Sequence, residues 1–403
     1  MNHNMANSNQ PSQGTPACSC LLRAVGLLTG DMQQCAEWVK RQIVVIQLLD
    51  CILRGIAQVM FVNNPLSGLL IVVGLFLQNP WWGLNGLLGT VGSTVSAILL
   101  RQNREAVLAG LHGYNGTLVG MLMAIFSAKG DWYWWLLVPN VFMSMMCPIV
   151  SSALSSVANK WDLPILTLPF NILVCLHIAA TGASHPYFPQ VNIQPKTNLH
   201  LNYSTENFDI PQLFLSVPVG VGQVFGCDDP WTAGLILLAV LLCSPTICFH
   251  AMLGSAAGMS VGVALAAPPR DIYSGLWGYN SVLSCIAIGG VFYALTWQTH
   301  TLALICAIFS AYMFSATSKL MSMLGLPAFT WPFCLSALIF LLLTSENPNI
   351  CRLPLSAVSY PEKNRCYLRQ LKTLEKAGSS HQEEAPLEND RPNVQLEVEN
   401  ESL

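Results

Sequence analysis

The sequence predicts an all-α polytopic membrane protein with two homologous halves in inverted orientation. The distribution of charge and an internal repeat predict this fold class. Only 10% of the residues are charged and the mean hydropathy is +0.48, whereas soluble globular proteins carry roughly 25% charged residues. Asp, Glu, Lys and Arg are absent from residues 55–100, 230–269 and 272–318. Each stretch exceeds the roughly 20 apolar residues that cross a bilayer, and helices satisfy their own backbone groups in lipid.

An internal repeat relates the two halves of the chain. The segment Gly-Ile-Ala-Gln-Val at 55–59 recurs as Gly-Val-Gly-Gln-Val at 220–224, an offset of 165. The other matching segments are 110–115 with 275–280 and, at an offset of 163, 163–170 with 326–333, which share the pattern Leu-Pro-x-x-Thr-x-Pro-Phe. Matches that keep their order over so much of the chain indicate a duplication.

We expect each half to contain five transmembrane helices plus one re-entrant pore helix. The expected crossings are 43–62, 66–79, 83–101, 132–156 and 163–182 in the first half and 211–227, 230–243, 246–266, 299–318 and 326–344 in the second. Gly, His and Asn interrupt the apolar segment 107–126, which therefore fits a helix buried in protein better than one facing lipid. The segment 272–292 is its equivalent in the second half.

An odd number of crossings per half predicts halves of opposite orientation, a frequent transporter architecture with the substrate path at the repeat interface. The expected regions are an N-terminal tail 1–40, a first half 41–183, a linker 184–210, a second half 211–346 and a C-terminal tail 347–403. Seven Lys and Arg residues follow the last crossing and only Lys196 lies in the linker, which places both tails in the cytosol and the linker outside. Arg101 and Arg104 would then lie outside, which counts against this orientation.

Three local features have simple structural interpretations. Asn202 begins the glycosylation sequon Asn-Tyr-Ser in the linker, which is useful only on the outer face of the membrane. Asn64 and Asp229 each precede a proline at the start of an apolar segment, so we expect them to cap the following helix. Asp50 and Arg54 are four residues apart and are expected to pair.

The repeated proline motif carries the strongest functional signal. Its prolines are Pro164, Pro169, Pro327 and Pro332. A proline inside a helix lacks an N–H and displaces the carbonyl four residues earlier, and such carbonyls are costly in lipid unless they face a polar cavity. We expect these prolines to expose carbonyls along a pore, with ordinary kinks as the alternative. Thr167 and Thr330 add a hydroxyl to the middle of each motif.

Two glutamines form a second symmetric pair. Gln58 and Gln223 lie in apolar stretches, where an unsatisfied carboxamide is costly. Each could hold a polar neutral solute, and a hydrogen bond between helices is the alternative. Phe61 follows Gln58 by one turn and could stack on a flat solute or simply pack. Because the symmetric polar groups are all uncharged, they suit a small neutral solute better than an ion.

The doubled motif makes the sequence resemble the vertebrate urea transporter family. Further marks are Phe-Val-Asn-Asn-Pro at 61–65, Gln-Asn-Pro-Trp-Trp at 78–82, Gly-Cys-Asp at 226–228 and Trp-Gln-Thr-His at 297–300. The resemblance implies a plasma-membrane homotrimer in the lipid bilayer, with one pore per subunit and passive, channel-like passage of urea and close analogues. It implies no cofactor, no metal, no nucleic acid and no enzymatic activity.

The resemblance also implies roles for single residues. Two outer binding sites would flank a central one. Gln58 and Phe61 would belong to one outer site and Gln223 to the other, Thr167 and Thr330 would line the centre, and Leu118 and Leu283 would narrow the passage. Some bacterial relatives carry a carboxylate at a glutamine position, so two glutamines here predict no dependence on charge.

Other functions lack their expected signals in the sequence. An intramembrane enzyme needs a nucleophile with its base or a metal constellation, and none repeats. No Cys and His spacing is typical of a zinc site. An ammonium channel would favour a central histidine pair and an aquaporin two Asn-Pro-Ala caps, and neither is evident. A structural or adhesion protein would not need paired polar groups at the repeat axis.

Overall fold

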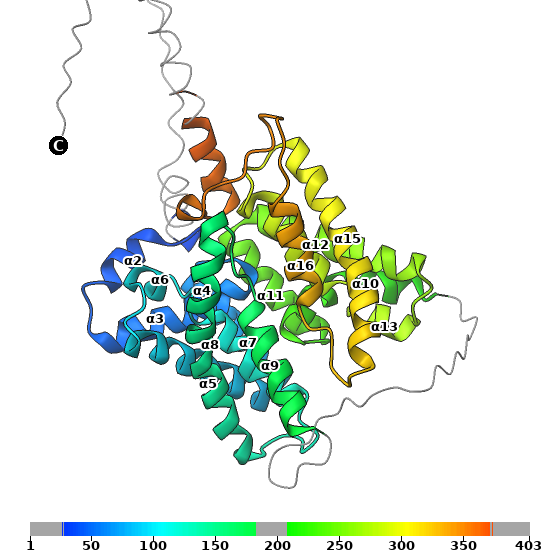
Figure 1. Ribbon diagram of the computed structural model, residues 1–403, viewed down its shortest axis with the longest axis horizontal. Coiled ribbons are helices and arrows are strands. Elements are labelled where there is room, and N and C mark those ends of the chain that lie inside the picture. Colours follow the sequence, from blue (N-terminus) through cyan, green and yellow to red (C-terminus); the bar gives the residue numbers. More distant parts are fainter. Residues whose placement is uncertain (1–25, 27, 183–207, 371–372, 374–403) are drawn as a thin grey trace, which may run out of the picture.

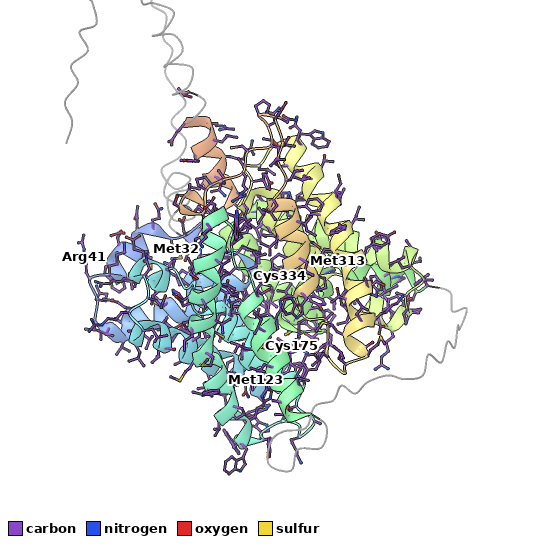
Figure 2. The ribbon with its side chains drawn as sticks, in the orientation of Figure 1. Met32, Arg41, Met123, Cys175, Met313 and Cys334 are labelled. Atoms are coloured by element: carbon purple, nitrogen blue, oxygen red, sulfur yellow. The ribbon has the colours of Figure 1, made fainter. Side chains whose placement is uncertain are left out.

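A computed structural model describes residues 26, 28–182, 208–370 and 373, which fold as a bundle of helices (Figure 1). The first half contains α2 (Gln33–Val39), α3 (Val44–Ala57), α4 (Pro65–Gln78), α5 (Pro80–Leu99), α6 (Arg104–Leu108), α7 (Tyr114–Ile125), α8 (Leu137–Ala158) and α9 (Leu168–Thr181). The second half contains α10 (Ile210–Gly222), α11 (Pro230–Cys243), α12 (Pro245–Ala264), α13 (Pro269–Tyr273), α14 (Tyr279–Ile286), α15 (Trp297–Ser322) and α16 (Trp331–Leu341). Side chains fill the space between these helices, and Figure 2 places Cys334 of α16 near the middle of the molecule.

Local capping starts α4 and α11 as the sequence predicts. The Asn64 carboxamide oxygen accepts hydrogen bonds from the N–H groups of Leu66 and Ser67, at 2.9 and 3.1 Å. The Asp229 carboxylate accepts one from the Thr232 N–H at 2.9 Å. Both helices place a proline in their first turn, where its missing N–H is tolerated. The capping prediction is therefore confirmed.

The predicted pairing of Asp50 with Arg54 is also confirmed. The Arg54 Nε donates to the Asp50 carboxylate at 2.8 Å within α3, and both side chains are buried. A second guanidinium nitrogen of Arg54 donates to the carbonyls of Asp31 and Asn63. The buried charge is thus paired and hydrogen-bonded, as a charge removed from water must be.

Two sharp corners distinguish the fold from a set of parallel spans. The 3₁₀ turn η1 (Gln58–Met60) ends α3, and the chain then bends by 77° into α4. The turn η4 (Gln223–Phe225) ends α10, and the bend into α11 is 76°. Phe61 and Gly226 form these corners with positive φ angles of 59° and 69°. The two halves therefore turn in the same way at matching positions.

The helices found at the expected membrane crossings differ in length. By length and composition, the described residues hold three helices able to cross a membrane, 134–161, 245–264 and 297–322, or up to five if each bent pair counts as one. The helices α4, α9 and α16 have 14, 14 and 11 residues. At 1.5 Å per residue they span about 21 Å or less, against roughly 30 Å for the hydrocarbon core. These short helices all begin beside a proline.

The helices α7 and α14 are enclosed by protein, as expected for the interrupted apolar segments. Nine of the 12 residues of α7 are buried, from Asn115 to Ala124. All residues of α14 after Tyr279 are buried, and the π-helical turn η5 (Ala287–Val291) that follows is buried too. Close backbone packing explains the glycines before α14, because a Cβ on Gly275 would lie 2.6 Å from the Gly220 nitrogen.

The two halves meet through α4 and α11, which pack against each other. The Ser67 hydroxyl of α4 donates to the Ala239 carbonyl of α11 at 2.6 Å, and the Thr232 hydroxyl of α11 donates to the Gly74 carbonyl of α4 at 3.3 Å. Ser67 and Thr232 are 165 residues apart, and so are Gly74 and Ala239. The contact is therefore reciprocal between matching positions of the repeat.

Candidate functional site

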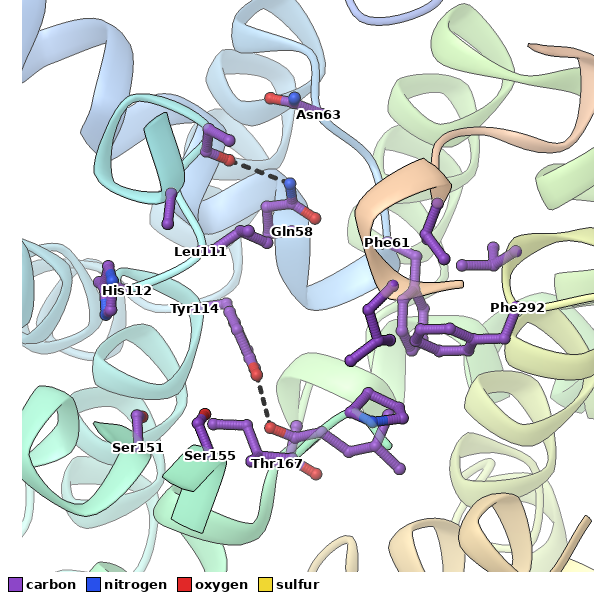
Figure 3. A pocket seen from close by; sticks show the side chains of 18 of the residues that line it. Gln58, Phe61, Asn63, Leu111, His112, Tyr114, Ser151, Ser155, Thr167 and Phe292 are labelled. Atoms are coloured by element: carbon purple, nitrogen blue, oxygen red, sulfur yellow. Dashed lines mark hydrogen bonds between the residues drawn. The ribbon is translucent and has the colours of Figure 1, made fainter. Parts of the chain in front are cut away.

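A cavity of about 730 Å³ is lined mostly by residues of the first half, with some from the second half and from residues 355–360 (Figure 3). It brings together five residues that the sequence singled out, namely Gln58, Phe61, Pro164, Thr167 and Leu283. Aromatic and aliphatic side chains form much of its wall, and Asp31 is the only carboxylate there, with no Lys or Arg among the lining residues. The other polar groups of the wall are mainly hydroxyls and carboxamides, from serine, threonine, asparagine and glutamine side chains. Apolar walls combined with polar groups of this kind suit a small neutral molecule.

Gln58 and Gln223 are held in the same way in the two halves. The Gln58 amide nitrogen donates to the Ala109 carbonyl at 3.0 Å, drawn as a dashed line in Figure 3. The Gln223 amide nitrogen donates to the Ser274 carbonyl at 2.7 Å, again 165 residues further on. These are the inter-element hydrogen bonds that were the alternative interpretation, and they fix each carboxamide while leaving its oxygen as an acceptor. Gln223 does not line the cavity.

Phe61 occupies a corner that is strained for its residue type. Its φ of 59° lies in the left-handed region, which costs about 1–3 kcal/mol for a residue other than glycine and marks functional sites. The ring makes edge-on contacts with Phe292 and Phe333, at centroid distances of 5.9 and 6.2 Å. Its counterpart Gly226 has no side chain, and a Cβ there would lie 2.6 Å from Ile125 Cδ1, which would have to move. The aromatic slot therefore exists in the first half only.

The two motif threonines meet at the centre. The hydroxyl oxygens of Thr167 and Thr330 lie 2.6 Å apart, and the two residues are 4% and 3% exposed. The Asn171 carboxamide oxygen accepts from the Thr330 N–H at 3.0 Å, and the Cys334 sulfur lies 3.2 Å from the Thr167 hydroxyl. Residues 163 positions apart in the sequence thus form one buried polar cluster.

Both proline pairs lie at the start of a helix and not inside one. Pro169 and Pro332 occupy the first turn of α9 and α16, where a missing N–H is tolerated. Pro164 and Pro327 precede these helices in segments that are not helical. The prediction that these prolines break helices from inside is therefore wrong, because the helix begins only after Pro164 and Pro327.

Two carbonyls in these segments have side-chain partners. Leu166 and Phe329 have left-handed φ angles of 51° and 44°. The Tyr114 hydroxyl donates to the Leu166 carbonyl at 2.5 Å, and the Tyr279 hydroxyl donates to the Phe329 carbonyl at 2.7 Å. The asparagine that follows each tyrosine donates to the same carbonyl. The tyrosine and asparagine of the repeated Gly-Leu-x-Gly-Tyr-Asn segment thus hold the proline motif in place.

The remaining predicted residues lie outside the wall of this cavity. Leu118 of α7 and Leu283 of α14 are each 1% exposed, and only Leu283 lines the cavity. The predicted residues that do not line it are Leu118, Gln223, Thr330, Pro169, Pro327 and Pro332. Asn202 falls within 183–207, outside the described residues.

Comparison with known proteins identifies the family. The urea transporter family profile matches residues 49–345. The chain belongs to the urea transporter family. Urea transporter 1 of Ovis aries is 55% identical over 350 residues, which cover 87% of this chain and 91% of that relative. Urea transporter 1 of Rattus norvegicus is 56% identical over 353 residues, which cover 88% and 92%. Urea transporter family members are multi-pass membrane transporters and not enzymes, and the resemblance in the sequence is confirmed.

In this urea transporter family member, part of the cavity wall comes from residues that follow residue 345, where the match to the family ends. Residues 347–370, here termed the C-terminal segment, contribute Leu355, Val358, Ser359 and Tyr360 to the wall. Asn364 anchors the segment, because its buried amide nitrogen donates to the carbonyls of Gly290 and Val291 at 2.8 and 3.0 Å. Sequence reasoning missed this contribution, since a polar basic tail has no apolar pattern that marks it as part of a wall.

The urea transporter fold also pairs two histidines that the sequence did not connect. His250 of α12 and His300 of α15 place ring nitrogens 3.2 Å apart. The other ring nitrogen of His250 lies 2.9 Å from the Thr246 carbonyl. The two positions are 50 residues apart and are not related by the repeat offset of 163 or 165, so they are not a symmetric pair of the two halves. The pair does not line the cavity, so it is not the central pair that an ammonium channel would need.

Proposed function

We propose that this urea transporter family member carries urea passively across the plasma membrane, in a channel-like manner, through one pore per subunit. The single observation that carries the proposal is the buried contact between Thr167 and Thr330 at the inner end of a nearly uncharged cavity. Urea is planar, with four N–H donors and one carbonyl acceptor. A narrow passage with uncharged acceptors and apolar walls suits this solute, and an ion would lose its hydration there without compensation.

The proposed route uses the residues in the roles that the resemblance implies. Gln58 and Phe61 form one outer site, Gln223 forms the other, and the two threonines form the centre. Leu118 and Leu283 narrow the passage, and the segments around Pro164, Pro169, Pro327 and Pro332 offer carbonyl oxygens. The side-chain amides of the two glutamines donate hydrogen bonds to matching carbonyls, which supports equivalent roles in the two halves. Several weak sites in series keep passage fast, as in ion channels.

The proposed architecture is an inverted repeat in which each half has five crossings and one re-entrant helix. Reciprocal bonds between α4 and α11 support a two-fold relation between the halves, because only a two-fold axis makes matching positions contact each other reciprocally. In transporters with an odd number of crossings per repeat, that axis lies in the membrane plane. The tails 1–40 and 347–403 are then cytosolic and the linker 184–210, with glycosylated Asn202, is outside.

The proposed assembly is a homotrimer embedded in lipid. Large apolar side chains on the outside of the bundle support contacts with lipid or other subunits. Trp231, Trp297 and Val44 are 84%, 77% and 76% exposed, and soluble monomers rarely display such groups together.

Purified protein in liposomes tests the proposal. Stopped-flow light scattering should show urea efflux at least about tenfold faster than from protein-free liposomes, with no need for a sodium or proton gradient. A panel of ions and neutral amides run in the same liposomes should show passage of urea and small amides only. Dependence on an ion gradient, or ion currents of comparable size, would contradict a passive neutral pore.

A further inference from the structure

Four buried side chains form a closed ring of hydrogen bonds around the central threonine pair. The ring consists of Thr167, Thr330, Asn171 and Cys334, of which the last two are fully buried. Asn171 and Cys334 each follow a motif threonine by four residues, so they occupy matching positions in the two halves. The symmetric threonines are thus flanked by an amide on one side and a thiol on the other.

Donor and acceptor rules determine the direction of this ring. The Asn171 oxygen is identified because it accepts from the backbone N–H of Thr330 at 3.0 Å. A carboxamide oxygen only accepts, so the Thr330 hydroxyl, 3.1 Å away, donates to it. The Thr330 proton is then engaged, and the Thr167 hydroxyl must donate across the 2.6 Å contact to the Thr330 oxygen.

The remaining two bonds close the ring. The Thr167 proton is also engaged, so the thiol of Cys334 donates to the Thr167 oxygen at 3.2 Å. The Asn171 amide nitrogen donates to the Cys334 sulfur at 3.6 Å. Hydrogen bonds that run in one direction polarise and strengthen one another in a buried site. The single amide therefore sets the direction of all four bonds.

We propose that Asn171 and Cys334 are positioning residues that make the central threonines act as acceptors only. A hydroxyl has one proton and two lone pairs. Within the ring each threonine gives its proton to a neighbour and accepts one bond, so each keeps one lone pair and no proton for a passing solute. This inference rests on the proposed function. Two hydroxyls that can only accept make the centre selective for N–H donors, and urea offers such donors on both nitrogens.

The difference between the halves is required for this arrangement. An asparagine at both positions would draw both hydroxyl protons toward amides and leave the contact between Thr167 and Thr330 without a proton. A cysteine at both positions would leave no amide to set a direction. One asparagine and one cysteine are therefore needed, and exchanging them should reverse the ring without breaking it.

An exchange experiment tests the proposal in liposomes. Asn171→Leu and Cys334→Asn should each lower urea efflux about tenfold, the effect expected when a buried polar group loses its partner. The double variant Asn171→Cys with Cys334→Asn should return to within about twofold of wild type. Cys175→Ala, a half-buried thiol of α9 outside the ring, is the matched control and should conduct normally.

A second readout separates positioning from a general structural role. Acetamide replaces one NH₂ of urea with a methyl group, so the ratio of urea to acetamide efflux reports recognition of N–H donors. This ratio should fall toward one in Asn171→Leu and recover in the exchange variant, whereas general damage lowers both fluxes alike. The proposal is overturned if the folded exchange variant stays as slow as the single variants, or if Asn171→Leu keeps the wild-type flux and ratio.

A measurement on the intact protein covers the case in which the variants do not fold. The infrared S–H band of Cys334, isolated by subtracting the spectrum of Cys334→Ala, should lie at the frequency of a donating thiol. A band at the free-thiol frequency overturns the ring. Thr167→Val and Thr330→Val test the proposed function separately: if both conduct urea normally the route itself is wrong, and if only the ring variants conduct normally the present inference alone fails.

Discussion

At the residue scale, some matching positions of the two halves make the same hydrogen bond, whereas others carry different residues. Gln58 and Gln223 donate to matching carbonyls and keep their oxygens as acceptors. Phe61 and Gly226 share a left-handed backbone, yet only the first half carries a ring. The proposed route is therefore chemically asymmetric, although the backbone around it is repeated.

A substitution at Gln58 tests the role of its carboxamide. Gln58→Leu removes the acceptor oxygen and leaves the Ala109 carbonyl without its donor, so urea efflux should fall about tenfold. Gln102→Leu changes a glutamine that lines the same cavity and whose side chain makes no hydrogen bond to the described residues, so it should conduct like wild type. Stopped-flow efflux from liposomes gives both values. Equal fluxes in the two variants would remove Gln58 from the route.

At the element scale, the site is positioned by where helices begin and by where two helices pack closely. The length of the helices matters less. The proline motifs begin α9 and α16 and leave the preceding residues free to meet at the centre. The helix α5 crosses α7 so closely at Gly89 that a Cβ there would overlap the Gly116 carbonyl oxygen. Residues near the centre are thus held by rigid backbone contacts, which is how precise sites are supported.

Two glycines one turn apart on α5 test this close crossing. A Cβ on Gly89 would overlap the Gly116 carbonyl, whereas a Cβ on Gly92 would meet its nearest atoms at an ordinary 3.6 Å. Gly89→Ala should therefore lower the melting temperature in detergent, with a cost of about 1–3 kcal/mol for overpacking, and should reduce urea flux. Gly92→Ala should be neutral or slightly stabilising because alanine favours helix. If the two variants have the same melting temperature, the close approach of α5 and α7 does not limit the side chain at position 89.

At the scale of the whole molecule, sequence reasoning captured what is local or repeated. Charge-free stretches predicted membrane helices, and the caps at Asn64 and Asp229 followed from neighbouring residues alone. The family resemblance implied that Thr167 and Thr330 would line the centre, and their hydroxyl oxygens lie 2.6 Å apart. The pairing of His250 with His300 was not predictable, since no pattern relates these positions. The wall formed by the C-terminal segment was missed for the same reason.

The C-terminal segment also ties together parts of both halves. Arg352 donates to the carbonyls of Trp161 and Asp162 from the first half. The carboxylate of Glu362 accepts from the Ser244 hydroxyl and the Thr246 N–H of the second half. Since the segment lines the cavity as well, its attachment should affect both the stability of the molecule and the passage of solute.

Adjacent residues of this segment permit a matched test. Asn364 is 1% exposed and satisfies two buried carbonyls of η5, so Asn364→Leu should destabilise the protein by about 1–3 kcal/mol and lower urea flux by loosening the wall. Lys363 pairs with Asp31 at 3.0 Å and its own side chain is 43% exposed. Exposed pairs contribute at most about 1 kcal/mol, so Lys363→Ala should leave the melting temperature nearly unchanged. Melting in detergent and efflux from liposomes measure the two effects. If Asn364→Leu melts and conducts like Lys363→Ala, the C-terminal segment covers the cavity without supporting it.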